Sequence, residues 1–322
     1  MRIIQKAETE QEVWSRLNAF RGPLAICIML SHIWGNNGLV LLVPFNKVVT
    51  VCVAVFLFLS GYGMTRSLEK KRESYWKEIL GIKIPYLLFM AVVVYLFSCA
   101  LQAATGAAVV EADSYLPLSA GRFLATTNWY IWELTGFYLA FAAVSGIRNA
   151  AIRNGIVLGG SVIAFLLLYR TGVVEGYYNS IFGFSFGMLA ASCKKPEIFG
   201  KKGAAVTGLI LCGVSFALMF LLDTSGRLFP LVRNAAAIGA CLLLMYLSWY
   251  VSIRCRVIDT LSRVSPEIYF FHIPITLVLS YVISHPYVYL LVDSAVSLAV
   301  AFAVHPVNRW INKKWRSLVK GS

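Results

Sequence analysis

The sequence has few charged residues for its length, and acids are the scarcer kind. Only 14% of its 322 residues are charged, with 15 Asp plus Glu against 29 Lys plus Arg, whereas 59% are hydrophobic. The mean hydropathy is +0.72. A soluble core cannot bury that much apolar surface without leaving large exposed patches, so we expect lipid to be the surrounding solvent.

The net charge of +14 does not indicate nucleic acid. That interpretation requires a basic face on a soluble domain, and here the basic residues fall in short clusters between apolar runs. Such clusters are typical of the inner face of a bilayer, where Lys and Arg meet anionic headgroups. No linker rich in Ser, Gly or Pro separates a soluble domain, so we predict one membrane domain over residues 1–322.

Signals for metal, disulfide and secretion are also missing. The seven cysteines show neither CxxC pairs nor Cys/His metal spacing, and most lie in apolar runs, so we expect packing roles and no metal. Residues 1–20 contain Glu8, Glu10 and Glu12 and no apolar stretch. We therefore predict a cytoplasmic N-terminal segment and a first helix that stays uncleaved.

Long apolar runs dominate what is present. Ten stretches lack Asp, Glu, Lys and Arg, and they cover residues 22–46, 48–65, 84–110, 134–147, 154–169, 176–193, 203–222, 234–253, 268–292 and 294–308. A helix needs about 20 residues to cross about 30 Å of hydrocarbon, and the shorter stretches can borrow flanking residues. The predicted fold is all-α: a polytopic integral membrane protein of about ten transmembrane helices.

The basic residues also predict the orientation. With both termini cytoplasmic, 24 Lys and Arg lie on the inner side and 5 on the outer side, as the positive-inside rule requires. Residues 309–322 then form a basic cytoplasmic tail. The longest connection, residues 105–127, lies outside and carries Glu111, Asp113 and Arg122.

Few ionisable side chains are expected inside spans, where each is costly enough to need a partner or a function. His32 follows Arg21 by eleven residues, which places it about 16 Å deeper and near the midplane at about 1.5 Å per residue. Glu133 is the only carboxylate expected well inside a span. The alternative for His32 is a packing role, which is common for a lone His. The alternative for Glu133 is an acid at a helix end.

Other residues in the apolar runs are expected to be structural. His285 and His305 stand near expected span ends, each followed directly by Pro. Gly183 and Gly187 form a GxxxG pattern, which is typical of close helix packing in membranes.

Several motifs, taken in order, resemble the acyltransferase 3 family over nearly the whole chain. The opening span carries Arg21, ten residues, then His32, and the next span ends in Ser60-Gly61-Tyr62. The remaining matches are Lys83 before Pro85, the aromatic run Asn128-Trp129-Tyr130-Ile131-Trp132, and Ser265, Tyr269 and His272-Ile273-Pro274. The sequence departs from the family pattern in two places. Gly81 and Ile82 stand where further basic residues are common, and Asn18 replaces an acid.

The resemblance implies acyl transfer from a cytoplasmic acyl-CoA, usually acetyl-CoA, to a sugar hydroxyl of a cell-surface or exported polysaccharide. His32 would act as general base or acyl carrier, with Glu133 and His272 as further polar site residues. Phosphate groups of the donor would be bound by basic residues at the inner face, since Arg and Lys both pair with phosphate. The candidate cofactor-binding residues are Arg21, Lys83, Arg66, Arg72 and Ser60. The predicted location is the inner (plasma) membrane of a bacterium.

Two other functions stay open. A secondary transporter would show midplane charges and broken helices in two matching halves, and only Glu133 and His32 fit that description. A membrane acyltransferase of a different kind would pair a His with Asn36, Asn37 or Asn234. Soluble acyltransferases with a His-x4-Asp motif are excluded, because none of the four His residues has Asp five residues later. The sequence indicates neither the glycan or lipid-linked saccharide that accepts the acyl group nor the oligomeric state.

Overall fold

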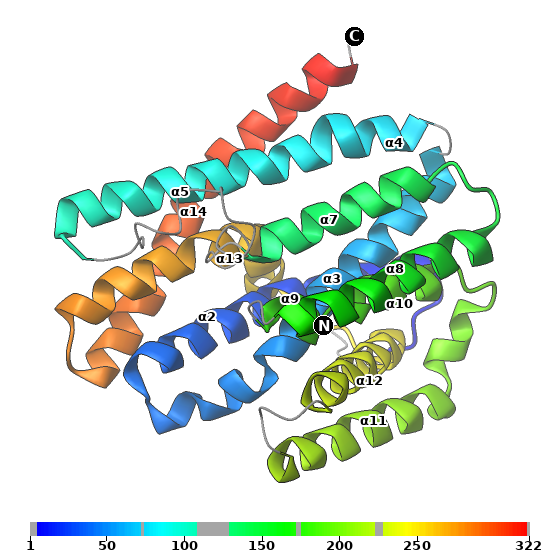
Figure 1. Cartoon of the computed structure of the whole chain (residues 1–322), viewed down its shortest axis with the longest axis horizontal. Coiled ribbons are helices and arrows are strands. Elements are labelled where there is room, and N and C mark those ends of the chain that lie inside the picture. Colours follow the sequence, from blue (N-terminus) through cyan, green and yellow to red (C-terminus); the bar gives the residue numbers. More distant parts are fainter. Residues whose placement is uncertain (1–4, 72–73, 108–128, 172–174, 223–227, 321–322) are drawn as a thin grey trace. The chain divides into compact units, whose positions relative to one another are not determined.

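A computed structural model describes residues 5–71, 74–107, 129–171, 175–222 and 228–320, and every element in these ranges is a helix. Figure 1 shows them in chain order. The α-helices are α1 (Glu10–Ala19), α2 (Arg21–Asn37), α3 (Val43–Lys71), α4 (Tyr75–Glu78), α5 (Ile84–Thr105), α7 (Trp129–Val144), α8 (Ala150–Thr171), α9 (Gly176–Asn179), α10 (Phe182–Ala191), α11 (Lys202–Leu221), α12 (Phe229–Tyr250), α13 (Arg256–Val282) and α14 (Pro286–Lys320). Short 3-10 helices cover Val40–Leu42 (η1) and Pro196–Gly200 (η5), and a π-helix covers Ile79–Lys83 (η3).

Six helical stretches in the described part of the chain are long and apolar enough to cross a membrane. They are Val40–Lys71, Tyr75–Thr105, Ala150–Thr171, Lys202–Met219, Phe229–Tyr250 and Pro286–Val319. The all-helical fold is thereby confirmed for the described residues, with six candidate membrane-spanning helices. The count of ten spans and the cytoplasmic position of both termini remain predictions, and the long connection at residues 105–127 lies largely outside the described residues.

The predicted boundary between the last two spans is wrong. The stretches that lack Asp, Glu, Lys and Arg place one span up to residue 292 and the next from residue 294, because Asp293 interrupts the run. In the structure α13 ends at Val282, α14 begins at Pro286, and Asp293 lies inside α14, fully buried. The Ser297 hydroxyl donates a hydrogen bond of 2.9 Å to the Asp293 carboxylate. This acid is therefore a buried residue within a helix, and it does not mark a loop between two helices.

The chain forms two compact units, and the first comprises residues 1–23, 50–76 and 140–262. Glycine allows α3 and α10 to approach closely in this unit. A Cβ atom at Gly61 would meet the Phe184 carbonyl, and one at Gly187 would meet the Phe58 carbonyl. Gly183 lies against the backbone of α3 in the same way. These contacts confirm that the GxxxG pattern marks helix packing.

Polar contacts fasten the short helix α1 within the same unit. Arg16 is buried and pairs with Glu12, and its guanidinium donates a hydrogen bond to the Gln5 carbonyl at 2.6 Å. The backbone N–H of Glu8 and the guanidinium of Arg16 hold the pKa of Glu12 below its ordinary value. The chain before α1 is therefore held to the helix by two contacts, one from Arg16 to Gln5 and one from Glu8 to Glu12.

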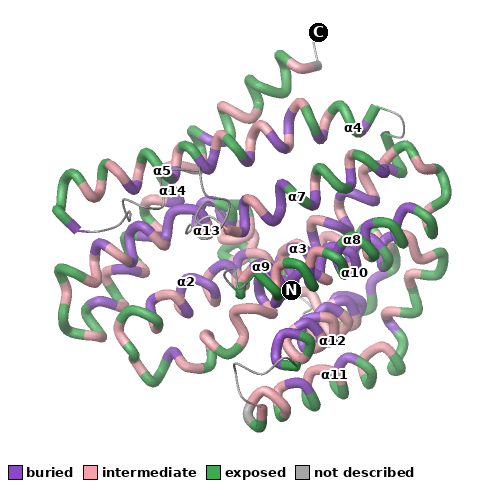
Figure 2. The backbone as a smooth tube through the Cα atoms, viewed as in Figure 1, coloured by how far each residue is buried: buried purple, intermediate pink, exposed green. Residues whose placement is uncertain are grey.

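The second unit comprises residues 24–49, 77–139 and 263–322. Its helices α5 and α14 leave large apolar side chains exposed, including Val92, Leu96 and Leu291, as expected for surfaces that face lipid. The middle of α13 is buried, and Figure 2 shows this contrast within the unit. His272 lies in that buried stretch, so one of the predicted site residues is in the interior of the unit.

Candidate active site

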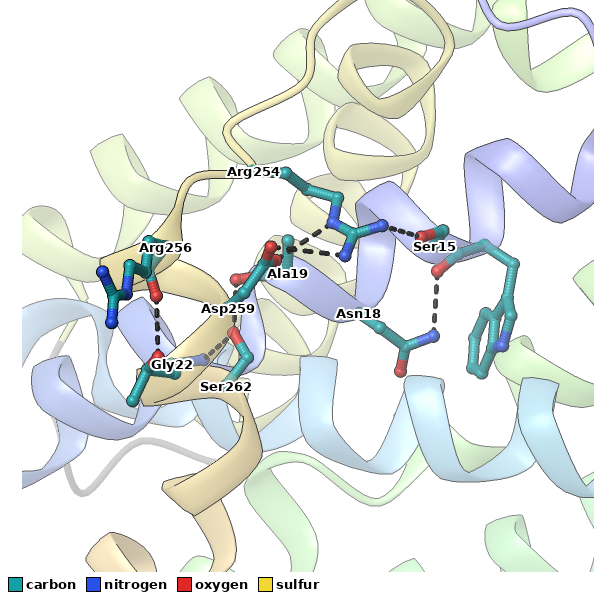
Figure 3. Close-up of polar contacts among 10 residues, drawn as sticks. Ser15, Asn18, Ala19, Gly22, Arg254, Arg256, Asp259 and Ser262 are labelled. Atoms are coloured by element: carbon teal, nitrogen blue, oxygen red, sulfur yellow. Dashed lines mark hydrogen bonds and ion pairs between the residues drawn. The ribbon is translucent and has the colours of Figure 1, made fainter. Parts of the chain in front are cut away.

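Within the first unit, the ends of α1, α2 and α13 meet in a junction of polar contacts, which Figure 3 shows in close-up. Arg254 donates hydrogen bonds to the Ser15 hydroxyl at 2.7 Å and to the Asp259 carboxylate at 3.0 Å. The hydrogen bond to Asp259 raises the pKa of the Arg254 guanidinium. These contacts anchor the first turn of α13 beside α1.

Ser262 joins α13 to the start of α2 in the same junction (Figure 3). Its hydroxyl donates to the Ala19 carbonyl at 2.8 Å and accepts from the Gly22 N–H at 3.1 Å. The absence of a side chain at Gly22 permits this approach, since a Cβ atom there would lie 2.8 Å from the Leu261 Cβ. Arg21, the predicted phosphate ligand, is the residue that begins α2 at this point.

The two candidate histidines meet in the second unit. His32 belongs to α2 and His272 to α13, and their ring centroids lie 5.1 Å apart. His272 is 1% exposed, whereas His32 is partly exposed. The sequence predicted both residues as site residues, and the structure brings them together.

The hydrogen bonding of His272 defines its tautomer. Its Nδ1 lies 2.9 Å from the carbonyl oxygen of Ile268, and a carbonyl can only accept, so Nδ1 carries the proton. The Nε2 atom then carries a lone pair. It is buried and has no hydrogen-bond partner among the described residues. An imidazole in this state is prepared to accept a proton or to attack an electrophile.

Aromatic rings extend the site from His272 toward α7. The Tyr269 ring centre lies 6.0 Å from that of His272 and 4.8 Å from that of Tyr130. The Tyr130 ring in turn lies edge-on to Trp129, with the centres 6.1 Å apart. Three aromatic side chains that the family motifs had singled out therefore form one group next to the histidines.

Glu133 lies one turn after Tyr130 on α7. It is only 8% exposed, and neither of its carboxylate oxygens has a hydrogen-bond partner in the described part of the chain. Tyr130, which precedes it by three residues on the same helix face, packs on Tyr269. The predicted site acid is thus placed beside the aromatic group, with acceptor capacity to spare.

The predicted site residues are divided between the two units. The second unit contains four of them, which are His32, Lys83, Glu133 and His272. The first unit contains three predicted cofactor-binding residues, which are Arg21, Ser60 and Arg66. Arg72 lies outside the described residues. Only the residues of the second unit can therefore be placed with respect to the histidine pair.

The contacts of the predicted cofactor-binding residues differ. Arg66 forms ion pairs with Glu10 and with Glu69, and the Ser60 hydroxyl donates to a carbonyl of its own helix at 2.9 Å. Lys83 ends the π-helix η3, with its ammonium 5.9 Å from the Tyr138 ring centre. Arg66 is thus ion-paired within its own unit, whereas Lys83 lies at the end of a π-helical turn.

Two buried acids escaped the sequence prediction, which treated Glu133 as the only carboxylate inside a span. Asp293 is one, and Glu267 of α13 is the other, with 3% exposure. Glu267 lies 3.2 Å from Nδ1 of His305 and accepts a hydrogen bond of 3.1 Å from Asn308. Both acids had been used to delimit apolar runs. The apolar helical periodicity continues past both acids, and this continuity was the signal that could have placed them inside helices.

The asparagines of the alternative acyltransferase chemistry are engaged with the backbone. Asn36 donates to the His32 carbonyl at 2.9 Å, and Asn37 accepts from the Leu39 N–H at 2.9 Å. Asn234 donates to two backbone carbonyls, at 2.8 and 2.9 Å. These contacts cap or join helices, so they give no support to a His and Asn catalytic pair.

Comparison with known families agrees with the motifs. The family model described as an acyltransferase domain matches residues 14–305, a range that includes α2, α13 and both histidines. The resemblance stated from the sequence is thereby confirmed. No curated protein and no solved structure gave a significant match.

Proposed function

Since the chain belongs to the acyltransferase domain family, we propose that it transfers an acyl group, most simply acetyl, from cytoplasmic acyl-CoA to a sugar hydroxyl of a surface or exported polysaccharide. The acceptor is the polysaccharide itself or a lipid-linked saccharide. We place the protein in the plasma membrane of a bacterium. The observation that carries the proposal is the pairing of His32 with the buried His272, whose Nε2 lone pair is unpaired among the described residues.

In the proposed reaction His272 is the general base, a role that the sequence had favoured for His32. Its Nε2 takes the proton of the acceptor hydroxyl as the oxygen attacks the thioester carbonyl carbon. The new C–O bond forms, the C–S bond breaks, and the CoA thiolate leaves with the electron pair of that bond. The proton on His272 then passes to the thiolate, directly or through the neighbouring His32, which gives CoA thiol and the O-acyl sugar. Nδ1 keeps its hydrogen bond to the Ile268 carbonyl throughout.

The remaining side chains suit the acceptor. Sugar rings pack on aromatic faces, and Trp129, Tyr130 and Tyr269 form a neighbouring group of rings. A buried carboxylate with unpaired oxygens gains from a hydroxyl donor, because leaving such oxygens unsatisfied is costly. Glu133 therefore orients the acceptor by receiving a hydrogen bond from one of its hydroxyl groups.

The test uses the purified protein in lipid vesicles with acetyl-CoA and saccharide fragments as acceptors. Formation of O-acetyl sugar is followed by mass spectrometry, and release of CoA is followed through its thiol. In cells, the surface polysaccharide of a deletion strain is compared with that of a strain carrying the gene again. Loss of acyl groups on deletion and their return on complementation are the expected results. Unchanged polysaccharide acylation in the deletion strain would contradict the proposal.

A further inference from the structure

Helix α14 is longer than a membrane span. Its 35 residues, Pro286–Lys320, extend about 52 Å at about 1.5 Å per residue, whereas the hydrocarbon core is about 30 Å thick. Its Lys and Arg residues begin at Arg309, so we expect the part from there to the end to project beyond the hydrocarbon. In Figures 1 and 2 this part is the helix that leads to the C-terminus, and most of its residues are exposed.

This projecting segment packs on the π-helix η3 of the same unit. The Trp315 indole N–H donates a hydrogen bond of 2.9 Å to the Gly81 carbonyl. A Cβ atom at Gly81 would lie 3.2 Å from a methyl group of Val319, so the glycine makes room for the helix. Beside them, Arg316 lies 3.9 Å from the Glu78 carboxylate.

The Trp315 contact compensates for a missing backbone donor. In a regular α-helix the Gly81 carbonyl would accept from the residue four positions later, which is Pro85 and has no N–H. The chain adopts a π-helical turn here, with the Ile84 N–H bonded to the Ile79 carbonyl. Single π-turns inside helices are frequent at functional sites. This one ends at Lys83, so the Trp315 hydrogen bond holds the backbone that carries Lys83.

A row of basic residues runs along one flank of the projecting segment. Arg309, Lys313 and Arg316 are spaced four and three residues apart, which places them on one side of a helix. Arg309 and Lys313 are exposed, and the Arg316 side chain is 44% exposed. Because Arg316 adjoins Glu78, the row borders the turn that leads to Lys83. We call Arg309, Lys313 and Arg316 the basic row.

We propose that the basic row and η3 together bind the nucleotide phosphates of acyl-CoA, with Trp315 as the positioning residue for Lys83. The proposal rests on the proposed function. Phosphate is bound well by Arg forks and by Lys point charges. The row belongs to the same compact unit as His32 and His272.

The opposite flank of α14 favours a soluble ligand over a lipid headgroup for the basic row. Val307, Trp310 and Leu318 are all more than half exposed, and their spacing places them together, away from the basic row. Lys314 lies with them, its ammonium 5.2 Å from the Trp310 ring centre. This aromatic and apolar flank is suited to the membrane interface, which leaves the basic row for a ligand that comes from the aqueous phase.

The test is the double variant Arg309→Gln/Lys313→Gln, assayed in vesicles with two donors. With acetyl-CoA, KM should rise roughly tenfold or more, because charge-assisted hydrogen bonds to phosphate are lost, while kcat stays unchanged. With S-acetyl-pantetheine, which has no nucleotide phosphates, KM and kcat should match those of the unaltered protein. Lys314→Gln, on the other flank of the same helix turn, is the matched control and should leave the kinetics with both donors unaffected.

Direct binding of CoA, measured by calorimetry, separates this proposal from the proposed function. If the unaltered protein binds CoA and the double variant binds it at least tenfold more weakly, the phosphate site stands even where no acyl transfer is observed, and only the proposed function fails. Equal CoA affinity in both proteins would overturn the site. So would a variant whose KM for acetyl-CoA is unchanged but whose activation by vesicles containing phosphatidylglycerol is lost, because that result assigns the basic row to lipid headgroups.

Trp315→Phe tests the positioning role. Phenylalanine preserves most of the packing on Gly81 but cannot donate to its carbonyl. We expect a severalfold higher KM for acetyl-CoA with unchanged thermal stability and unchanged kinetics with S-acetyl-pantetheine. A loss of stability, or equal impairment with both donors, would show that Trp315 is merely structural.

Discussion

The imidazole rings of His32 and His272 lie 5.1 Å apart between centroids, with their planes inclined by 47°. The two residues are on different helices and 240 positions apart in the sequence. The two rings are neighbours, so we expect the two side chains to act together in the proposed reaction.

The first prediction concerns this pair. His272→Ala should lower the rate of acyl transfer by about 10² to 10⁴, the usual effect of losing a general base. His32→Ala should lower it as well, and the double variant should be no slower than His272→Ala, since residues that act as a unit are not additive. CoA binding, measured in parallel, should be unchanged. If His32→Ala alone abolishes transfer while His272→Ala retains most of it, the base is His32.

The second prediction concerns Gly22→Ala at the contact of α2 with α13. The added methyl group would lie 2.8 Å from the Leu261 Cβ and equally close to the backbone N of Ser262, so the two helices must separate. We expect about 1–3 kcal/mol lower stability, as for other overpacked contacts, measured as loss of folded protein in detergent. Gly35→Ala on the same helix is the control, because nothing lies within 4 Å of its Cβ position. Equal effects at the two glycines would refute the close contact.

The third prediction concerns the crossing of α3 and α10. Gly187→Ala places a methyl group against the Phe58 carbonyl, which is backbone and cannot turn aside. We expect the thermal midpoint in detergent to fall clearly. Gly159→Ala in α8 has nothing within 4 Å and should be neutral or stabilising by about 0.5–1 kcal/mol, because Ala suits a helix better than Gly. A Gly187→Ala protein as stable as the Gly159→Ala protein would show that the helices do not pack this closely.

The fourth prediction concerns topology. Reporter fusions within residues 196–201, in the region of η5, should indicate the cytoplasmic side, and fusions within residues 283–285, between α13 and α14, should indicate the outer side. The reason is the 24 to 5 partition of basic residues. Alkaline phosphatase and green fluorescent protein report opposite sides and control for each other. A reversed signal at either position would invalidate both the orientation and the donor site at the inner face.

The fifth prediction separates two basic residues that the sequence treated alike. Arg66 is paired with Glu10 and Glu69, so Arg66→Gln should leave the KM for acetyl-CoA unchanged. Lys83→Gln should raise that KM roughly tenfold, because it removes a charge next to the proposed phosphate site. Initial rates over a range of acetyl-CoA concentrations give both values. A larger effect at Arg66 than at Lys83 would move the donor site to α3.

The sequence was a good guide to the all-helical fold and to the family, and a poor guide to buried acids. Apolar runs located the helices because hydrophobicity governs insertion, and the motif order identified the family. A charge-free criterion cannot distinguish an acid in a loop from one buried in a helix, so Asp293 and Glu267 were placed at span ends. Gly81 was interpreted only as a missing basic residue. In the structure Gly81 makes room for Val319, which is 238 residues away in the sequence. A local sequence pattern cannot predict such a long-range contact.

The buried carboxylate of Asp293 has a consequence for how the protein is made. An Asp at the centre of a transmembrane helix opposes insertion from the translocon by about 2.5–3.5 kcal/mol, and one nearer the helix end by less. Ser297 on the same helix offsets part of this cost, and Tyr289 of α14 donates a hydrogen bond of 2.8 Å to the Thr276 carbonyl of α13. The short connection at 283–285 keeps the two helices adjacent from the start. Helix α14 is therefore expected to enter the bilayer together with α13, as a hairpin, so that biogenesis of the last two helices is a single step.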